Sequence, residues 1–222
     1  MEIQENIINE LLDSPMAPAI VERVQSVLED ERKRRELFYN QITEQEKAEF
    51  INGEVIVHSP VRKIHSQIGL NLIRILDTYI VEHELGFLGF EKILIRCTRN
   101  DYEPDLCFFE QSIAAELEDD RTIFPIPNFI VEVLSKGTAA RDRGIKFDDY
   151  EAHGVQEYWI IDPDEKMVEQ YLLSEEGKFE LRLKSNSGKV QLVTIEGLVV
   201  PIEAIFDAQL AHQFIKELYL NS

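Results

Sequence analysis

The 222-residue sequence contains only two cysteines, Cys97 and Cys107, which are too few for a disulfide framework. Both lie in predicted strands and suit the core of a protein from a reducing compartment. No apolar run approaches the roughly 18 residues that a transmembrane helix needs. The first fourteen residues lack the basic start of a signal peptide. We therefore expect a cytoplasmic protein that does not enter a membrane.

Positive charge is also scarce, because 23 Lys and Arg residues stand against 42 Asp and Glu, giving a formal net charge of -19. Nucleic-acid binders usually carry a basic footprint, since neutralising phosphate supplies much of their affinity. The whole chain should therefore repel DNA at long range, although a local basic strip can coexist with an acidic average. The sequence also has no Walker-type lysine loop and no Gly-x-Gly-x-x-Gly, so nucleotide cofactors are not indicated.

Apolar residues make up 44% of the chain, which is ample material for a packed core. Their helical spacing predicts helices at about 18–36, 62–84 and 208–220. A charged helix is expected at about 138–152. Thr43-Glu44-Gln45-Glu46 matches a capping box, which predicts a short helix running to about Phe50.

Short apolar runs bounded by turn residues predict the strands. Before Asp162-Pro163 these runs alternate with helical segments, whereas the later runs follow one another as antiparallel hairpins. The predicted strands cover about 54–57, 87–98, 105–109, 128–134, 155–162, 167–173, 178–183, 189–193 and 197–201. This order predicts an α/β (α+β) chain with a central mixed sheet between helices and a β-rich C-terminal part.

Two acids stand inside apolar strands. Asp105 begins an apolar run directly after Pro104, and Glu132 lies in the middle of another. An acid among Ile and Val is rarely buried without a partner or a metal. Mg²⁺ prefers oxygen ligands and commonly uses one or two carboxylates. The pair therefore suits a divalent-cation site, while the alternative is that Asp105 caps a turn and Glu132 pairs with an interior Arg or Lys.

The ordered set of motifs resembles the PD-(D/E)xK nuclease superfamily, and within it a branch of bacterial proteins regarded as endonucleases (the Uma-two type). The matching segments are Gly53-Glu54-Val55-Ile56, Ser59-Pro60, His65, Glu103-Pro104-Asp105, Val131-Glu132-Val133-Leu134-Ser135, Asp142, Lys146, Tyr150, Gly154-Val155, Glu157-Tyr158-Trp159 and Asp162-Pro163. The resemblance implies a restriction-endonuclease-like core over residues 43–173. Residues 1–42 are then a helical extension, and residues 174–222 add β-hairpins and a closing helix to the same domain.

The resemblance also implies hydrolysis of DNA phosphodiester bonds with Mg²⁺ or Mn²⁺ as cofactor. Asp105 and Glu132 would hold the metal, with the backbone carbonyl of Val133 as a further ligand. Glu54 is either an additional carboxylate of the site or an exposed acid at a strand edge. His65 is a candidate for binding substrate, although a histidine beside an apolar stripe is more often structural.

One departure from the superfamily pattern concerns its lysine. Leu134 stands where the motif expects lysine, and the branch resembled here places its lysine in the following helix, at Lys146. Lys146 shares a helix face with Asp142, four residues earlier. We predict that its ammonium contacts the attacking water or the scissile phosphate; the alternative is an ion pair with Asp142, worth only about 0.3–0.5 kcal/mol. Arg143 and Lys136 are the spare cations if Lys146 points away, and Arg143 is a candidate for substrate binding.

Two other functions stay open. A nuclease fold that binds or scaffolds without cleaving would suit the net charge and the displaced lysine, and a hydrolase of a small phosphorylated molecule would need a closed pocket. A DNA enzyme needs an open groove flanked by cations, and the segments near the site contain Arg62, Lys63, Lys136, Arg141, Arg143 and Lys146. The strands after Lys166 suit either a homodimer interface or a cover for the core.

Overall fold

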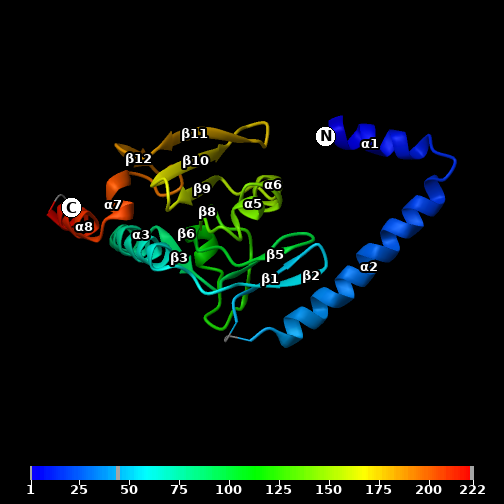
Figure 1. Ribbon diagram of the computed structural model, residues 1–222, viewed down its shortest axis with the longest axis horizontal. Coiled ribbons are helices and arrows are strands. Elements are labelled where there is room, and N and C mark those ends of the chain that lie inside the picture. The colour runs from blue at the N-terminus through cyan, green and yellow to red at the C-terminus, as the bar shows by residue number, and fades with distance from the viewer. Residues whose placement is uncertain (1, 44–45, 221–222) are drawn as a thin grey trace.

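The structure is a computed structural model that describes residues 2–43 and 46–220. Its N-terminal part is a helical arm made of α1 (Glu2–Leu12) and α2 (Ala17–Gln41). Figure 1 shows α1 and the first half of α2 standing away from the rest of the chain. No described helix is both long enough and apolar enough to cross a membrane.

Buried charge fixes the C-terminal half of α2 to the body of the protein. The guanidinium of Arg35 donates to Asp101 at 2.5 and 2.6 Å and to the carbonyl oxygen of Cys97 at 2.7 Å. Glu31 lies one helical turn before Arg35 in α2, and both of its carboxylate oxygens accept from Arg99, at 2.7 and 2.8 Å. The predicted helix at 18–36 is therefore confirmed and continues by about one further turn, because its last turns have tertiary partners.

The body is built on a six-stranded sheet with the order β11-β10-β9-β8-β6-β3. Only β8 and β9 pair in parallel within it, and the other neighbours are antiparallel. Its strands are β3 (Gly86–Phe90), β6 (Leu106–Glu110), β8 (Phe129–Val133), β9 (Glu157–Asp162), β10 (Met167–Leu173) and β11 (Phe179–Ser185). The sheet is mixed, as the sequence predicts.

A second sheet has the order β2-β1-β5-β4-β7, and a separate hairpin joins β12 to β13. The strands of the second sheet are β1 (Ala48–Ile51), β2 (Glu54–Val57), β4 (Leu94–Arg96), β5 (Asp101–Tyr102) and β7 (Ile123–Phe124); the hairpin is β12 (Lys189–Gln191) with β13 (Val199–Pro201). The remaining helices are α3 (Lys63–Glu82), α4 (Gln111–Ala114), α5 (Ala139–Asp142), α6 (Ile145–Ala152), α7 (Ile202–Phe206) and α8 (Ala208–Leu220). In Figure 1, α3, α7 and α8 lie together on one side of the body, while α5 and α6 lie near the end of β8.

The alternation of β8 decides where its acid points. Val131 and Val133 pack in the core cluster that contains α3 residues such as Leu72, whereas Ile130 packs in the cluster on the opposite face. Successive side chains of a strand point to opposite faces. Glu132 therefore shares the face of Ile130, which is also the face that Tyr150 of α6 covers.

The helix predicted after Thr43 is wrong. Residues 44 and 45 of the capping box lie outside the described residues, but Ala48–Ile51 form the buried strand β1, paired with β2. Asn52 and Gly53 at the turn have φ values of 50° and 82°, and a two-residue type I′ hairpin turn needs positive φ at both positions. Four buried strand positions and a favourable turn outweigh a local capping preference.

The single helix predicted at 138–152 is two helices. α5 ends at Asp142 and α6 begins at Ile145. At Gly144 between them, a Cβ atom would lie 2.8 Å from the carbonyl oxygen of Ala140, so the break accommodates a backbone contact that a side chain would obstruct. The short helix α7 has no counterpart among the predicted elements.

Candidate active site

Asp105 and Glu132 come together because β6 and β8 are neighbours in the large sheet. Asp105 directly precedes β6, and its Oδ2 accepts a hydrogen bond of 2.8 Å from the backbone N–H of Val133, at the end of β8. The other oxygen, Oδ1, accepts from Lys47 Nζ at 2.9 Å and lies 3.2 Å from His65 Nε2. Burial opposes ionisation, but His65 and Lys47 hold the pKa of Asp105 below its usual range. Asp105 is thus a fixed carboxylate at the strand end.

Glu132 is held from the other side by α6. Lys146 Nζ donates to Glu132 Oε1 at 2.9 Å, and the Tyr150 hydroxyl donates to the same oxygen at 3.0 Å. Among the described residues, Glu132 Oε2 accepts no hydrogen bond. Burial raises the pKa of Glu132 to about 8, and Asp142 and Asp105 act in the same direction, while Lys146 opposes them.

Lys146 lies at the centre of a cluster of carboxylates, with a side chain only 1% exposed. Its Nζ is 2.7 Å from Glu49 Oε1, 2.9 Å from Glu132 and 3.5 Å from Asp142. Burial lowers the pKa of Lys146, but the three acids together raise it well above its usual value. Lys146 and His58 in turn lower the pKa of Glu49 to about 2 against the effect of burial. We therefore take Glu49 as the ionised partner of Lys146. Glu132 is then a second carboxyl group beside the same ammonium, without a cation of its own.

Asp105, Glu132 and Lys146 border a cavity of about 710 Å³. The turn between β8 and α5, the segment between β2 and α3, and the residue before β6 all contribute to it. Its charged lining is mostly basic: the cations are Lys47, Arg62, Lys92, Lys136, Arg141 and Lys146, and the acids are Glu91, Asp105 and Glu132. A chain with a formal net charge of -19 thus gathers positive charge around two buried carboxylates.

A second cavity, of about 560 Å³, lies between α2 and the body. Its charged residues include Glu31 and Arg99, which pair with each other, and Arg35, which pairs with Asp101. Because these charges already have partners that attach the arm, this cavity is better explained as a packing feature than as a reaction site.

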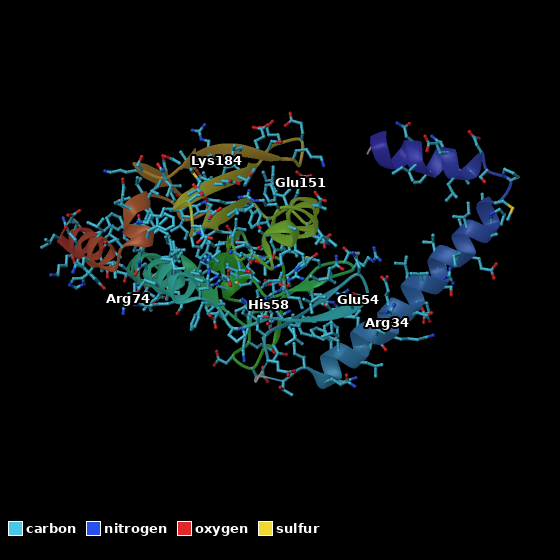
Figure 2. The ribbon with its side chains drawn as sticks, in the orientation of Figure 1. Arg34, Glu54, His58, Arg74, Glu151 and Lys184 are labelled. Carbon is cyan, nitrogen blue, oxygen red and sulfur yellow. The ribbon has the colours of Figure 1, made fainter. Side chains whose placement is uncertain are left out.

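The structure brings five of the sequence-predicted residues to the larger cavity: Asp105, Glu132, Val133, Lys146 and His65. Glu54 does not reach it. Glu54 is exposed and pairs with Ile51 at the turn end of the β1–β2 hairpin. Figure 2 shows Glu54 at that end and His58 nearer the body. Arg143 does not reach the cavity either, because its guanidinium pairs with Glu169 on β10.

Sequence reasoning missed Glu49 and Lys47. Glu49 is fully buried in β1 and belongs to the carboxylate cluster around Lys146, for which Glu54 was one candidate. Its oxygen also accepts from the backbone N–H of Glu103 at 3.1 Å, while Glu103 accepts from the N–H of Ala48 at 2.9 Å. An acid within the apolar segment Ala48–Ile51 is the same signal as Glu132, and it was hidden because this segment was assigned to a helix.

A divalent cation fits this chemistry, although no group of three or more His, Cys, Asp or Glu in residues 2–43 and 46–220 has the geometry to hold one. The supporting observation is that Glu132 borders the cavity and that its Oε2 accepts no hydrogen bond among the described residues. Buried carboxylate oxygen is a hard ligand suited to Mg²⁺ or Mn²⁺. Asp105 and Glu132 are the two residues that could hold such an ion.

Comparison with known proteins identifies the fold. Residues 35–203 match the model of the Uma2 family, which is described as "Putative restriction endonuclease". The chain is similar to the uncharacterized protein sll1609 of Synechocystis (30% identity over 128 residues, 57% of this chain and 72% of that protein). It is also similar to the uncharacterized protein slr1290 of the same organism (27% identity over 169 residues, 73% of this chain and 85% of that protein).

One solved structure is similar in fold. It is the crystal structure of a "putative nuclease belonging to DUF820" from Anabaena variabilis, with a TM-score of 0.66 and 21% sequence identity, covering 78% of this chain and 96% of that one. At this identity the likeness concerns the fold. The predicted resemblance and the predicted mixed α/β, nuclease-like fold class are both confirmed.

Proposed function

The chain belongs to the Uma2 family, and from this membership we propose that it is a metal-dependent endonuclease that hydrolyses phosphodiester bonds of DNA. A nuclease-like function is the coarse part of this statement and rests on the family and on the nuclease-like fold. The metal and the DNA substrate are the finer part, and they rest on the cavity.

The observation that carries the proposal is the combination of two buried carboxylates with a basic lining in an acidic protein. A phosphodiester carries negative charge and needs cations around it, while a divalent ion needs carboxylate oxygen. The cavity offers both within one hollow. Among the described residues, Glu132 Oε1 accepts from Lys146 and Tyr150 while its Oε2 accepts no hydrogen bond, which leaves one oxygen of this carboxylate for a ligand from the cavity.

Each side chain then has a distinct task. Asp105 and Glu132 would bind Mg²⁺ or Mn²⁺, with the Val133 carbonyl as a further ligand. When bound, such an ion would lower the pKa of water and neutralise charge on the phosphate. His65 and Lys47 hold Asp105 in one orientation through its Oδ1. Lys146 holds Glu132 and Glu49 at fixed positions and places an ammonium at the cavity wall, where we propose that it meets the reacting phosphate or water.

The test is cleavage of supercoiled plasmid DNA by the purified chain, with and without Mn²⁺ or Mg²⁺. We expect nicked and linear products only with the metal, and their loss in Asp105→Asn and Glu132→Gln, which keep the shape of each side chain. Asp77→Asn, an exposed acid on α3, is the matched control and should cleave as the unchanged protein does. Cleavage that survives both site substitutions would refute the proposal, and so would a folded protein that cleaves no DNA with any divalent ion.

A further inference from the structure

Arg141 lies at the cavity, and its side chain has no partner among the residues that the structure describes. It belongs to α5, one residue before Asp142, and it is among the residues that line the cavity. Its Nε is buried and makes no hydrogen bond. No carboxylate within residues 2–43 and 46–220 forms an ion pair with its guanidinium. A buried donor without a partner is uncommon and is costly, so the site is suited to an acceptor that comes from outside the chain.

Arg143, two residues later, is in the opposite situation. Both of its terminal nitrogens donate to Glu169 on β10, and Arg143 Nη2 lies 3.1 Å from Glu169 Oε1. Lys184 on β11 pairs with the same carboxylate at 2.9 Å. Of these two neighbouring arginines, Arg143 therefore stabilises the sheet and Arg141 is left for a ligand.

The chemistry of the cavity indicates which ligand. A guanidinium is planar and always charged, and it presents parallel N–H donors that match the oxygens of phosphate or carboxylate. Other cations line the same cavity, including Lys47 and Lys136, so the local field favours an anion over a neutral ligand. The buried pair Asp105 and Glu132 lies in the same hollow, and a polyanion that approaches these acids needs a cation beside them.

We propose that Arg141 is a substrate-binding residue that holds a backbone phosphate of the nucleic acid next to the reacting one, through its guanidinium. This inference rests on the proposed function and deepens it by naming the residue that fixes the strand in the cavity. It reassigns the substrate-binding role that the sequence pattern suggested for Arg143.

Binding can be measured apart from cleavage. A fluorescein-labelled single-stranded DNA of twelve nucleotides is titrated with the purified chain in Ca²⁺, at several salt concentrations, and anisotropy gives Kd. We expect Arg141→Gln to weaken binding by about tenfold or more at low salt, as loss of a charge-assisted contact implies. The slope of log Kd against log salt should fall by about 0.7, because one phosphate contact is lost. Arg141→Lys keeps the positive charge but lacks the parallel N–H donors of the guanidinium, and it should give an intermediate Kd.

Two arginine substitutions separate this contact from general charge. Arg74→Gln removes an exposed arginine of α3, labelled in Figure 2, and should leave Kd and the salt slope unchanged. Arg143→Gln should lower the melting temperature and leave the salt slope unchanged. Melting curves are recorded for every variant, to check that each is folded at the temperature of the binding assay.

The outcomes are distinct from those of the cleavage assay. Equal Kd and salt slope for Arg141→Gln and the unchanged protein would overturn the inference, as would a wild-type chain that does not bind the oligonucleotide. Competition by inorganic phosphate at micromolar concentration would also overturn it, because the site would then bind free phosphate and not a strand. Binding that depends on Arg141 without any cleavage would support the inference while refuting the nuclease.

Discussion

Replacing Lys146 by methionine tests how strongly the carboxylate cluster depends on one buried charge. Methionine has a similar length and can fill the same space without an ammonium. The substitution leaves Glu49, Glu132 and Asp142 without the cation that lies 2.7, 2.9 and 3.5 Å from them. Since all three acids are buried, water cannot replace the lost partner without rearranging the site.

The size of the effect follows from this geometry. Removing one partner of a buried ion pair costs about 3–5 kcal/mol, since the other charge stays buried and uncompensated. For a chain of this size each kcal/mol lowers the melting temperature by about 2–4 °C, so the expected decrease is about 6–20 °C. Lys33→Met is the control, because Lys33 is 63% exposed and lies 4.0 and 3.9 Å from Glu29 and Asp30. Its change should stay within about 0.5 kcal/mol.

The assay is urea unfolding at pH 7, followed by circular dichroism, for Lys146→Met, Glu49→Gln and the double variant. We expect the double variant to be less destabilised than the two single effects add up to, because removing the ionised Glu49 relieves part of the uncompensated charge. A loss below about 1 kcal/mol for Lys146→Met would refute the buried-cluster reasoning. Strict additivity in the double variant would refute the pairing of Lys146 with Glu49.

Other predictions concern the arm, the sheet and the metal. Arg35→Met should lower the free energy of unfolding by about 3–5 kcal/mol, measured in urea, since it leaves Asp101 buried without its partner. Arg143 and Lys184 lower the pKa of Glu169 to about 2 although burial opposes them, so this pairing stabilises the fold above pH 4.5 and the stabilisation disappears as the pH falls towards 2. The free energy of unfolding of Glu169→Gln should therefore fall less between pH 4.5 and pH 2 than that of the unchanged protein. An equal fall in both proteins would contradict the pairing of Glu169 with Arg143 and Lys184. Mn²⁺ should raise the melting temperature of the unchanged protein, as a ligand of the folded state does, and Glu132→Gln should abolish the increase.

The large sheet and its two acids were predictable because the signals are local. Glu132 is flanked by β-branched residues, and a strand with an acid among them must direct that acid to a protected partner. That β6 and β8 lie side by side, however, depends on the order of the strands in the sheet. The pattern of apolar and polar residues along a single strand does not reveal this order. The resemblance implied a restriction-endonuclease-like core with a mixed sheet, and the order of its strands comes from the structure.

In the first hairpin the sequence offered Glu54 as a possible carboxylate of the site or as an exposed strand-edge acid, and it did not point to Glu49, five residues earlier. Glu54 follows the turn and looks like a strand residue, whereas Glu49 lies in a segment that also matches the end of a capped helix. β1 pairs with β2 in a local hairpin and with β5 through Phe50 and Asp101, and the pairing with β5 is long-range. The different surroundings of Arg141 and Arg143 were equally hard to predict, since Arg143 pairs with Glu169, which lies far along the chain on β10.

The most direct test of the central claim is a crystal of this protein soaked in MnCl₂ and measured at the manganese absorption edge. The account predicts an anomalous peak in the cavity, about 2.0–2.3 Å from carboxylate oxygens of both Asp105 and Glu132. The peak should be absent from Glu132→Gln crystals treated in the same way. An anomalous difference map without a peak at these two residues, or with manganese bound only elsewhere, would contradict the account.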